Sequence, residues 1–126
     1  MNTIAKCPCP SGKPYQDCCQ PGHQGTPAIN AEALMRSRYS AYVLGLEQYL
    51  LDTWHTDTRP TSLSLSKESA TQWLDLSIKR FEETSRTAAI VEFVARFKVG
   101  GHTDRLHEVS QFTLTDRWYY LSGEIE

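Results

Sequence analysis

Residues 91–97 read Val-Glu-Phe-Val-Ala-Arg-Phe, and the alternation within them determines the architecture of the chain. The first, third, fifth and seventh of these residues are apolar, while Glu92 and Arg96 stand between them. Successive side chains of a strand point to opposite faces, so a period of two is typical of a strand with one packed face and one solvated face. The stretch therefore predicts a strand whose apolar side covers a core.

The same period of two recurs on both sides of this strand. Leu74, Leu76 and Ile78 share a face in the preceding strand, which begins at Trp73. Later strands are expected at about 105–114 and 117–121, with connections at 83–87, 100–103 and 115–116. Consecutive strands with such short connections form an antiparallel meander with one packed face.

A helical pattern precedes the strands. Asn30 is a good N-cap, and apolar residues follow it at steps of three and four up to residue 54. Gly45 either weakens this helix or marks a bend in it. The helix must lie across the packed face of the sheet, so the fold class is α+β, with about four strands. Residues 55–66 are expected to form a loop, and residues 67–72 a short turn. The apolar stripe consists of Leu34, Tyr39, Tyr42, Val43, Leu46, Leu50 and Trp54.

Length and charge narrow the classes of function. The chain has 126 residues, the usual size of one domain, and a net charge of −2. A protein that coats nucleic acid normally carries a basic surplus, so a nucleic-acid partner is disfavoured, although a small local basic patch is compatible with this balance. No stretch approaches the roughly 20 apolar residues that span a bilayer. The first residues lack the apolar core of a secretory signal, so we expect a cytoplasmic location.

Four cysteines lie near the N-terminus: Cys7, Cys9, Cys18 and Cys19. Thiolates suit tetrahedral zinc, and the turn residues 11–14 can reverse the chain and bring the two pairs together. Four thiolates close the coordination shell, which favours one structural zinc over a catalytic one. Two disulfides are the main alternative, but adjacent cysteines bridge only with strain, and cytosolic thiols stay reduced.

Residues 1–29 differ in composition from the rest of the chain. They hold all four cysteines and almost no bulky aliphatic residues, so metal binding rather than burial must order them. Lys13 and Tyr15 are expected on an exposed contact surface, and His23 is a less favoured alternative ligand. The expected organisation is a zinc-binding motif at 1–22, a linker at 23–30 and an α+β domain at 31–126.

The run at 7–19, Cys-Pro-Cys-Pro-Ser-Gly-Lys-Pro-Tyr-Gln-Asp-Cys-Cys, closely resembles the SEC-C motif, the zinc finger at the C-terminus of the SecA translocase motor. That motif usually has glycine where this chain has Pro10, and it often ends in histidine where this chain has Cys19. The resemblance implies a finger that docks on a protein or ribosomal partner.

Further segments resemble the YchJ family of uncharacterised bacterial proteins. The resemblance covers nearly the whole chain and implies a nuclear transport factor 2-like (NTF2-like) fold, in which a curved sheet wraps around helices. It implies no biochemical activity. The segments that carry it are 31–42, 53–55, 58–60, 91–97, 107–108 and 118–120.

Strand alternation also sorts the polar residues of the α+β domain. In the strand at 105–114 it places Glu108 and Ser110 on the inner face and His107 on the outer face, which argues against a His107–Glu108 catalytic dyad. An inward carboxylate needs a partner, which Arg38 of the helix can supply. Arg36 is an alternative partner, and Tyr39 or Tyr42 is the expected hydrogen-bond donor.

Two interpretations of this group stay open. One is a buried polar network that fixes the helix to the sheet. The other is a ligand or active-site pocket formed by Arg38, Tyr39, Glu108 and Ser110.

The favoured function is a non-enzymatic zinc-binding protein. Its finger is expected to dock on a protein or ribosomal partner, and its second domain to bind a partner or a small ligand. The alternative is a small enzyme with Glu108 as general base. RNA binding is disfavoured, because the aromatic residues have as many acidic as basic neighbours and are better explained by packing. These aromatic residues are Trp54, Trp73, Trp118, Tyr119 and Tyr120.

Overall fold

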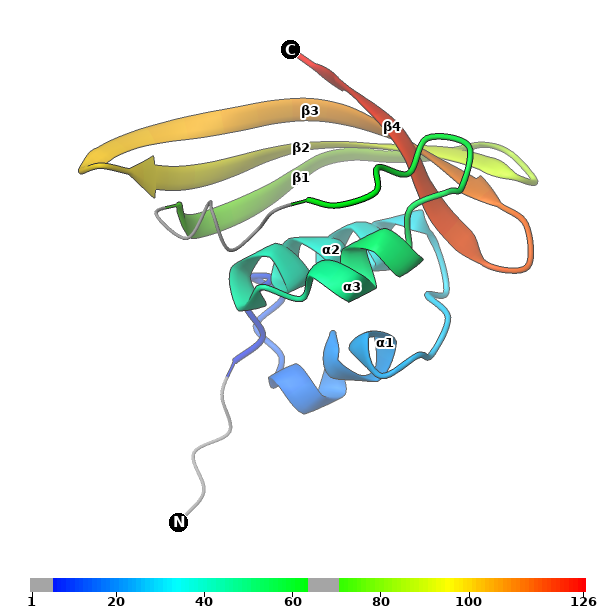
Figure 1. Cartoon of the computed structure of the whole chain (residues 1–126), viewed down its shortest axis with the longest axis horizontal. Coiled ribbons are helices and arrows are strands. Elements are labelled where there is room, and N and C mark those ends of the chain that lie inside the picture. The colour runs from blue at the N-terminus through cyan, green and yellow to red at the C-terminus, as the bar shows by residue number, and fades with distance from the viewer. Residues whose placement is uncertain (1–5, 64–70) are drawn as a thin grey trace.

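The computed structural model describes residues 6–63 and 71–126. Its helices are α1 (Gln20–His23), α2 (Ala31–Leu44) and α3 (Glu47–Asp52), with a 3-10 turn at Tyr15–Asp17. Its strands are β1 (Gln72–Ser85), β2 (Ala88–Val99), β3 (His102–Leu114) and β4 (Trp118–Ile125). Figure 1 shows the sheet on one side, α2 and α3 beneath it, and α1 with the cysteine-rich segment below those helices.

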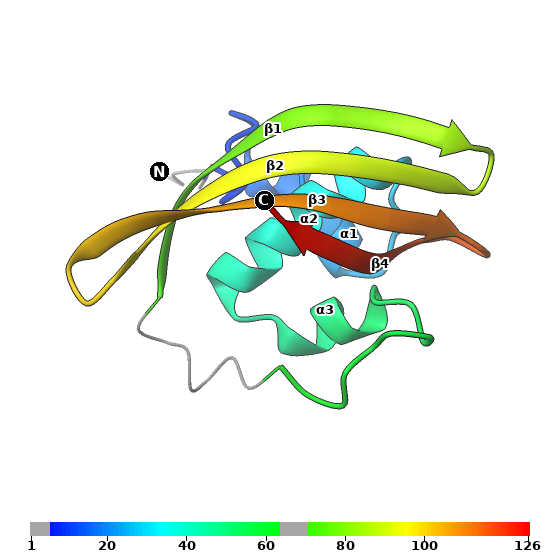
Figure 2. The same ribbon diagram turned by 90° about the horizontal axis from the view of Figure 1, so that it is seen from above.

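The strands pair antiparallel in the order β1-β2-β3-β4, which confirms the predicted meander (Figure 2). The strands are longer than predicted, since β3 begins at His102 and β4 continues to Ile125. Gly100 and Gly101 have φ angles of 57° and 83°, and this backbone reverses the chain within two residues. The end of β4 escapes sequence prediction because residues 122–124 are polar or glycine.

Helix α2 begins where the sequence predicts. The Oδ1 atom of Asn30 accepts a hydrogen bond from the Ala33 N–H at 2.8 Å, which caps the first turn. The prediction that one helix continues to residue 54 is wrong. Gly45 has φ 73° and ψ 32°, the left-handed C-cap conformation, so α2 ends at Leu44 and α3 begins as a separate helix.

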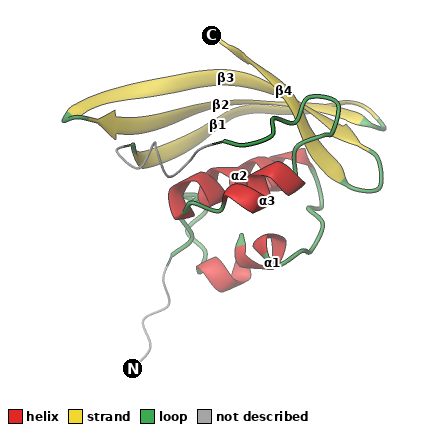
Figure 3. Ribbon diagram, viewed as in Figure 1, coloured by secondary structure: helices red, strands yellow, loops and turns green. Residues whose placement is uncertain are grey.

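One face of the sheet packs on the helices, and Figure 3 shows no helix across the opposite face in the described part of the chain. Leu34 and Met35 of α2 are buried in the same cluster as Val91, Phe93 and Phe112 of the sheet. Burying one such side chain contributes about 1.5–3 kcal/mol, so this layer is a main source of stability. The predicted inner face of the sheet is therefore confirmed for β2 and for Leu76 and Ile78 of β1. Leu74 is an exception, because the pairing shifts register between Trp73 and Asp75 and leaves this side chain 41% exposed.

The segment after α3 covers the edge of the sheet at β4. The Tyr120 N–H donates to the Thr53 carbonyl at 2.8 Å, and the His55 N–H donates to the Tyr120 carbonyl at 2.8 Å. The Trp54 ring packs edge-on against the Tyr120 ring with centroids 4.8 Å apart. A covered edge protects β4 from pairing with another chain.

The described part of the predicted loop, residues 55–63, contains no helix or strand. The turn predicted at 67–72 lies mostly outside the described residues. None of the described helices is long and apolar enough to cross a membrane.

Candidate metal centre and ligand cavity

The four cysteine sulfurs come together at one point. All four lie within 4.8 Å of one another, and the measured Sγ–Sγ distances are 3.5 Å for Cys9–Cys18, 3.6 Å for Cys9–Cys19 and 3.9 Å for Cys18–Cys19. Four sulfurs at about 2.3 Å from a tetrahedral zinc ion are about 3.8 Å apart, so these distances fit a zinc shell. They exceed the roughly 2.05 Å of a disulfide bond. The four cysteines, Cys7 included, therefore form a plausible metal site that is consistent with zinc.

The chain reversal between the two cysteine pairs follows from local hydrogen bonds. The Cys7 N–H donates to the Lys13 carbonyl at 2.9 Å, and Gly12 has a φ of 84° that favours glycine. The Ser11 hydroxyl lies 3.1 Å from the sulfur of Cys18. The loop between the pairs is therefore shaped by its own backbone, as the turn residues predict.

Ser40 of α2 reaches into the cysteine cluster. Its side chain is fully buried, and its Oγ lies 3.2 Å from the sulfur of Cys19 and 3.5 Å from the sulfur of Cys7. The same oxygen accepts a hydrogen bond from the Cys9 N–H at 3.1 Å. Groups that hydrogen-bond to metal ligands orient them and tune the affinity. The metal centre is thus built partly from the α+β domain.

His23 joins the motif to α2 and does not replace a cysteine. Its Nε2 lies 2.8 Å from the Ser37 carbonyl, which can only accept, so Nε2 carries the proton. Its Nδ1 therefore accepts a hydrogen bond from the Tyr15 hydroxyl at 2.6 Å. Burial lowers the pKa of His23, which favours this neutral form. Both ring nitrogens are engaged within the protein.

These contacts change the expected finger surface. Lys13 is exposed, as predicted, whereas Tyr15 is only partly exposed because its hydroxyl faces His23. Tyr15 also packs against the buried core. The prediction that Tyr15 belongs to an open contact surface is therefore corrected.

Sulfur–sulfur hydrogen bonds shift the pKa values of Cys9 and Cys19 in opposite directions. The hydrogen bond from Cys19 lowers the pKa of Cys9 to about 4, against the effect of burial. The same hydrogen bond, together with burial, raises the pKa of Cys19. Neighbouring thiolates repel one another, so a divalent cation is needed for all four sulfurs to ionise together.

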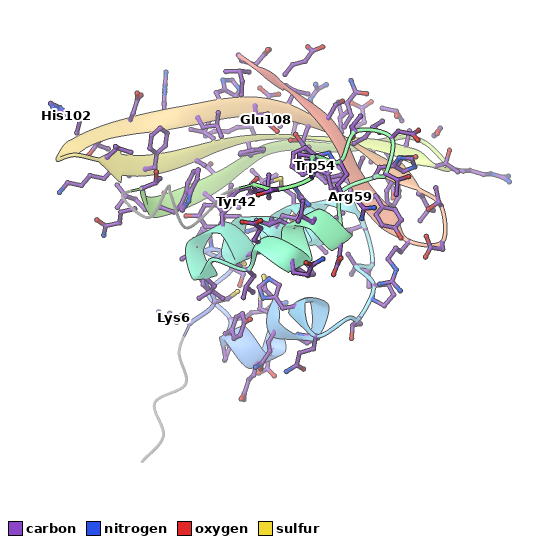
Figure 4. The ribbon with its side chains drawn as sticks, viewed as in Figure 1. Lys6, Tyr42, Trp54, Arg59, His102 and Glu108 are labelled. Carbon is purple, nitrogen blue, oxygen red and sulfur yellow. The ribbon has the colours of Figure 1, made fainter. Side chains whose placement is uncertain are left out.

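A cavity lies on the other side of α2, between the helix and the sheet. Its volume is about 190 Å³. Figure 4 shows Tyr42 on the helix and Glu108 on the facing strand. Arg38, Tyr39, Glu108 and Ser110 all line this cavity, so the structure brings the four predicted pocket residues together. The remaining lining residues are Met35, Tyr42, Trp73, Phe93, Ala95, Leu106 and Tyr120.

Arg38 is a buried cation, only 3% exposed. Its Nη1 donates to the Leu50 carbonyl at 2.8 Å and to the Thr53 hydroxyl at 2.7 Å. Its guanidinium lies 4.5 Å from the ring centroid of Tyr120 and 5.2 Å from that of Trp54. The ion pairs found among residues 6–63 and 71–126 do not include Arg38. Burial lowers the pKa of Arg38, because the charged form loses hydration.

Glu108 is held by neighbours on the sheet. Its Oε2 accepts hydrogen bonds from the Ser110 hydroxyl and from the Tyr120 hydroxyl, the latter at 3.4 Å. Gly123 of β4 makes room for this carboxylate, since a β-carbon there would collide with Glu108 and lie 2.9 Å from the Tyr120 oxygen. Burial is the main cause that raises the pKa of Tyr120.

Three expectations about the partners of Glu108 are corrected. Within the residues that the structure describes, Arg38 forms no ion pair with Glu108, and its Nη1 donates to Leu50 and Thr53 instead. The hydrogen-bond donor is Tyr120 rather than Tyr39 or Tyr42. Arg36 instead pairs with Glu32 one turn earlier on α2, at 3.3 Å.

His107 lies on the outer face of the sheet, where its ring contacts Glu92. The Nε2 of His107 lies 2.7 Å from Oε2 of Glu92, which also has its Oε1 3.6 Å from the Arg80 Nε. His107 therefore pairs across the outer face, away from Glu108. The argument against a His107–Glu108 dyad is confirmed.

Sequence reasoning missed Ser40 at the cysteine cluster and Tyr120 at the cavity. Ser37 and Ser40 are three positions apart and therefore share a helix face, a signal that a neighbour packs closely there. Tyr120 shares a strand face with Trp118 by alternation, which is a second signal that was available.

Comparison with known proteins agrees with this architecture. Residues 30–123 match the family described as the YchJ middle NTF2-like domain. A UPF0225 protein of Chromobacterium violaceum is 52% identical, over 94% of this chain and 92% of its own length. UPF0225 protein BPP1723 of Bordetella parapertussis is 48% identical, over 96% of this chain and 93% of its own length.

Two solved structures are similar over the whole chain. RPA3114, a SEC-C motif containing protein from Rhodopseudomonas palustris, has a TM-score of 0.81 and 36% identity and covers 98% of both chains. A SEC-C motif containing protein from Psychrobacter arcticus has a TM-score of 0.78 and 30% identity, covering 100% of this chain and 77% of its own. The match supports an NTF2-like domain preceded by a SEC-C motif.

Proposed function

This chain belongs to the YchJ-like family of proteins with an NTF2-like domain, and on that premise we propose that it is a non-enzymatic binding protein. Its ligand is a small molecule held in the cavity between α2 and the sheet. A zinc ion bound by the four cysteines stabilises the helix that forms one wall of this cavity. A cytoplasmic location suits the protein, because thiols stay reduced there.

The observation that carries this proposal is the pair of opposite charges in one partly enclosed cavity. The hydrogen bonds of Arg38 to described residues come from Nη1 alone, and those of Glu108 go to Oε2 alone. The walls between these charges are mainly aromatic, including Tyr39 and Trp73. Binding sites of this kind combine an apolar lining with a few convergent polar groups.

The cavity indicates what kind of ligand fits. Its 190 Å³ equals the liquid volume of about six water molecules. A suitable ligand has a small apolar body and a polar head that accepts a hydrogen bond from Arg38 and donates one to Glu108. Carboxamides and amino acids carry such heads.

Benzamide is a direct probe of this cavity. In amide-shift NMR of the zinc-loaded full chain, millimolar benzamide is expected to shift the indole N–H of Trp73, which lines the cavity. Leu106→Trp fills the cavity and should abolish the shift. Leu74→Trp adds the same ring at a position that is 41% exposed and should preserve it. No shift in the wild type, or an equal shift in Leu106→Trp, contradicts the proposal.

One structural zinc per chain is the second part of the proposal. Elemental analysis of protein purified without added metal should give one zinc per chain, and Cys18→Ser should lower that content. A metal-free protein would contradict it.

An interaction role for the finger is a further part of the proposal. Lys13 is exposed, and its N–H donates to the Ser11 hydroxyl at 3.2 Å, which gives the loop a defined shape. We expect the protein to co-sediment with purified bacterial ribosomes, and Lys13→Glu to lose this while keeping its zinc. Wild-type protein that stays in the supernatant would refute a ribosomal partner.

A further inference from the structure

The open face of the sheet carries a second site, independent of the cavity and of the function proposed for it. A hollow of about 620 Å³ lies there. It is near the turn between β2 and β3, after which His102 begins β3 (Figure 4). We propose that this hollow binds a phosphate-type oxyanion, either free phosphate or the phosphate group of a small molecule. Its lining consists of Asp75, Ser77, Lys79, Val94, Arg96, Thr103, Asp104 and Arg105.

The strand register places two arginines side by side. Arg96 of β2 is directly opposite Arg105 of β3, and Asp75 of β1 is opposite Arg96 on the other side. Residues directly opposite each other in a sheet have β-carbons about 4.5–5.5 Å apart, and like charges in such a pair destabilise it. The sheet therefore carries a local repulsion that a bound anion would relieve.

The three basic residues of the hollow differ in their ion pairing from Arg80, a neighbour on the same sheet. Arg80 lies on the same sheet and approaches Glu82 at 3.4 Å and Glu92 at 3.6 Å. In contrast, no ion pair found within residues 6–63 and 71–126 includes any of the three basic residues of the hollow. These three residues are Lys79, Arg96 and Arg105.

The two acidic residues of the hollow turn toward their own backbone. The Oδ1 of Asp75 accepts a hydrogen bond from the Leu76 N–H at 2.8 Å. The Oδ1 of Asp104 accepts one from the Arg105 N–H at 2.8 Å. The hollow thus contains more positive than negative side chains, although the whole chain has a net charge of −2.

The chemistry of these side chains selects the ligand. Guanidinium groups bind phosphate oxygens in a bidentate manner, and a lysine adds a point charge. Ser77 and Thr103 supply neutral hydroxyl donors beside them. None of the residues that line the hollow is aromatic, so it offers no surface for stacking bases of single-stranded RNA. A small phosphate-bearing ligand fits this set best.

The test is a titration of the zinc-loaded full chain with sodium phosphate, at an ionic strength matched with sodium chloride. Saturable amide shifts at the outer face of β1, β2 and β3 are expected with phosphate and not with chloride. The double variant Arg96→Gln/Arg105→Gln should lose at least tenfold in affinity. Arg80→Gln, which removes a paired arginine from the same sheet, should change the affinity less than twofold.

Two further measurements test the repulsion between the arginines and identify the source of the anion. Without phosphate, Arg105→Gln should raise the midpoint of thermal unfolding, because it removes the Arg96–Arg105 repulsion. Titration with ribose 5-phosphate separates the sources of the anion: tighter binding than phosphate indicates a phosphorylated small molecule, and equal binding indicates free phosphate. Phosphate shifts no larger than those with chloride, or equal shifts in the double variant, overturn the proposal.

Discussion

Ser40 is a residue of α2 whose buried hydroxyl lies against the cysteine cluster. It contacts two sulfurs and a backbone N–H of the cluster. We predict that Ser40→Ala weakens zinc affinity by roughly 10–100-fold, as is typical when a group that orients metal ligands is removed. Competition with a chromophoric chelator measures this. Ser122→Ala, on exposed β4 surface, should leave the affinity unchanged. Equal affinities in the two variants would show that the contact is incidental.

Gly123 determines the position of the Glu108 carboxylate. We predict that Gly123→Ala lowers the free energy of unfolding by about 1–3 kcal/mol, the usual cost of overpacking. The collision involves mainly Glu108, so the same change in a Glu108→Ala background should cost less. Urea unfolding of the four proteins in this cycle measures the difference. Additive effects would refute the assigned contact.

At the residue scale, the alternation of side chains along a strand was enough to predict which face of the sheet a residue occupies. Glu108 and Ser110 were expected on the inner face, and both line the cavity. Ser40 and Tyr120 were not assigned to a site, because their roles depend on which distant element packs against them. The sulfur of Cys19 is 21 positions from Ser40 in the sequence, and no local pattern reports that contact.

Helix α2 is the element that joins the two sites. The Ser40 hydroxyl contacts the cysteine sulfurs and the Ser37 carbonyl accepts a hydrogen bond from His23. Arg38 and Tyr39 of the same helix line the cavity. Removing the metal should therefore loosen α2 and disturb the cavity. We predict that a chelator shifts the indole N–H resonance of Trp73, which lies in the cavity and outside the motif. An unchanged Trp73 resonance in metal-free protein would mean that the two sites are uncoupled.

Gly45 controls where α2 ends. A non-glycine residue in the left-handed conformation costs about 1–2 kcal/mol, so Gly45→Ala should lower the free energy of unfolding by that amount. No atom lies within 4 Å of an added β-carbon, so the effect comes from the backbone alone. Gly22→Ala, in helix α1, is the matched control and should be near neutral. Equal stabilities of the two variants, measured by urea unfolding, would contradict this role.

The sequence predicted the elements well where the pattern is periodic. The start of α2 and the order of the strands follow from an N-cap and from alternation. The end of α2 was predicted wrongly, because the sequence alone suggested that Gly45 weakens or bends the helix, and only its backbone conformation shows that the helix ends there. The end of β4 was missed because residues 122–124 have low strand propensity, and glycine at position 123 leaves the space that the Glu108 carboxylate occupies.

At the scale of the whole molecule, the main surprise is how the cysteine motif is attached. Composition predicted a motif ordered by metal and joined to the domain by a linker. Instead, Cys7, Cys9 and Cys19 are buried in the same cluster as Leu34 and Val91. The motif and the domain share this packing, which composition cannot reveal because it depends on the tertiary arrangement. Metal binding is therefore expected to stabilise the whole protein.

Thermal unfolding of the metal-free full chain, before and after one equivalent of zinc is added, tests this expectation most directly. A ligand that binds only the folded state raises its stability in proportion to the logarithm of ligand concentration over Kd. We predict one cooperative transition, monitored by tryptophan fluorescence, whose midpoint rises on addition of zinc. A midpoint that does not change with zinc would contradict the claim that the metal centre supports the domain.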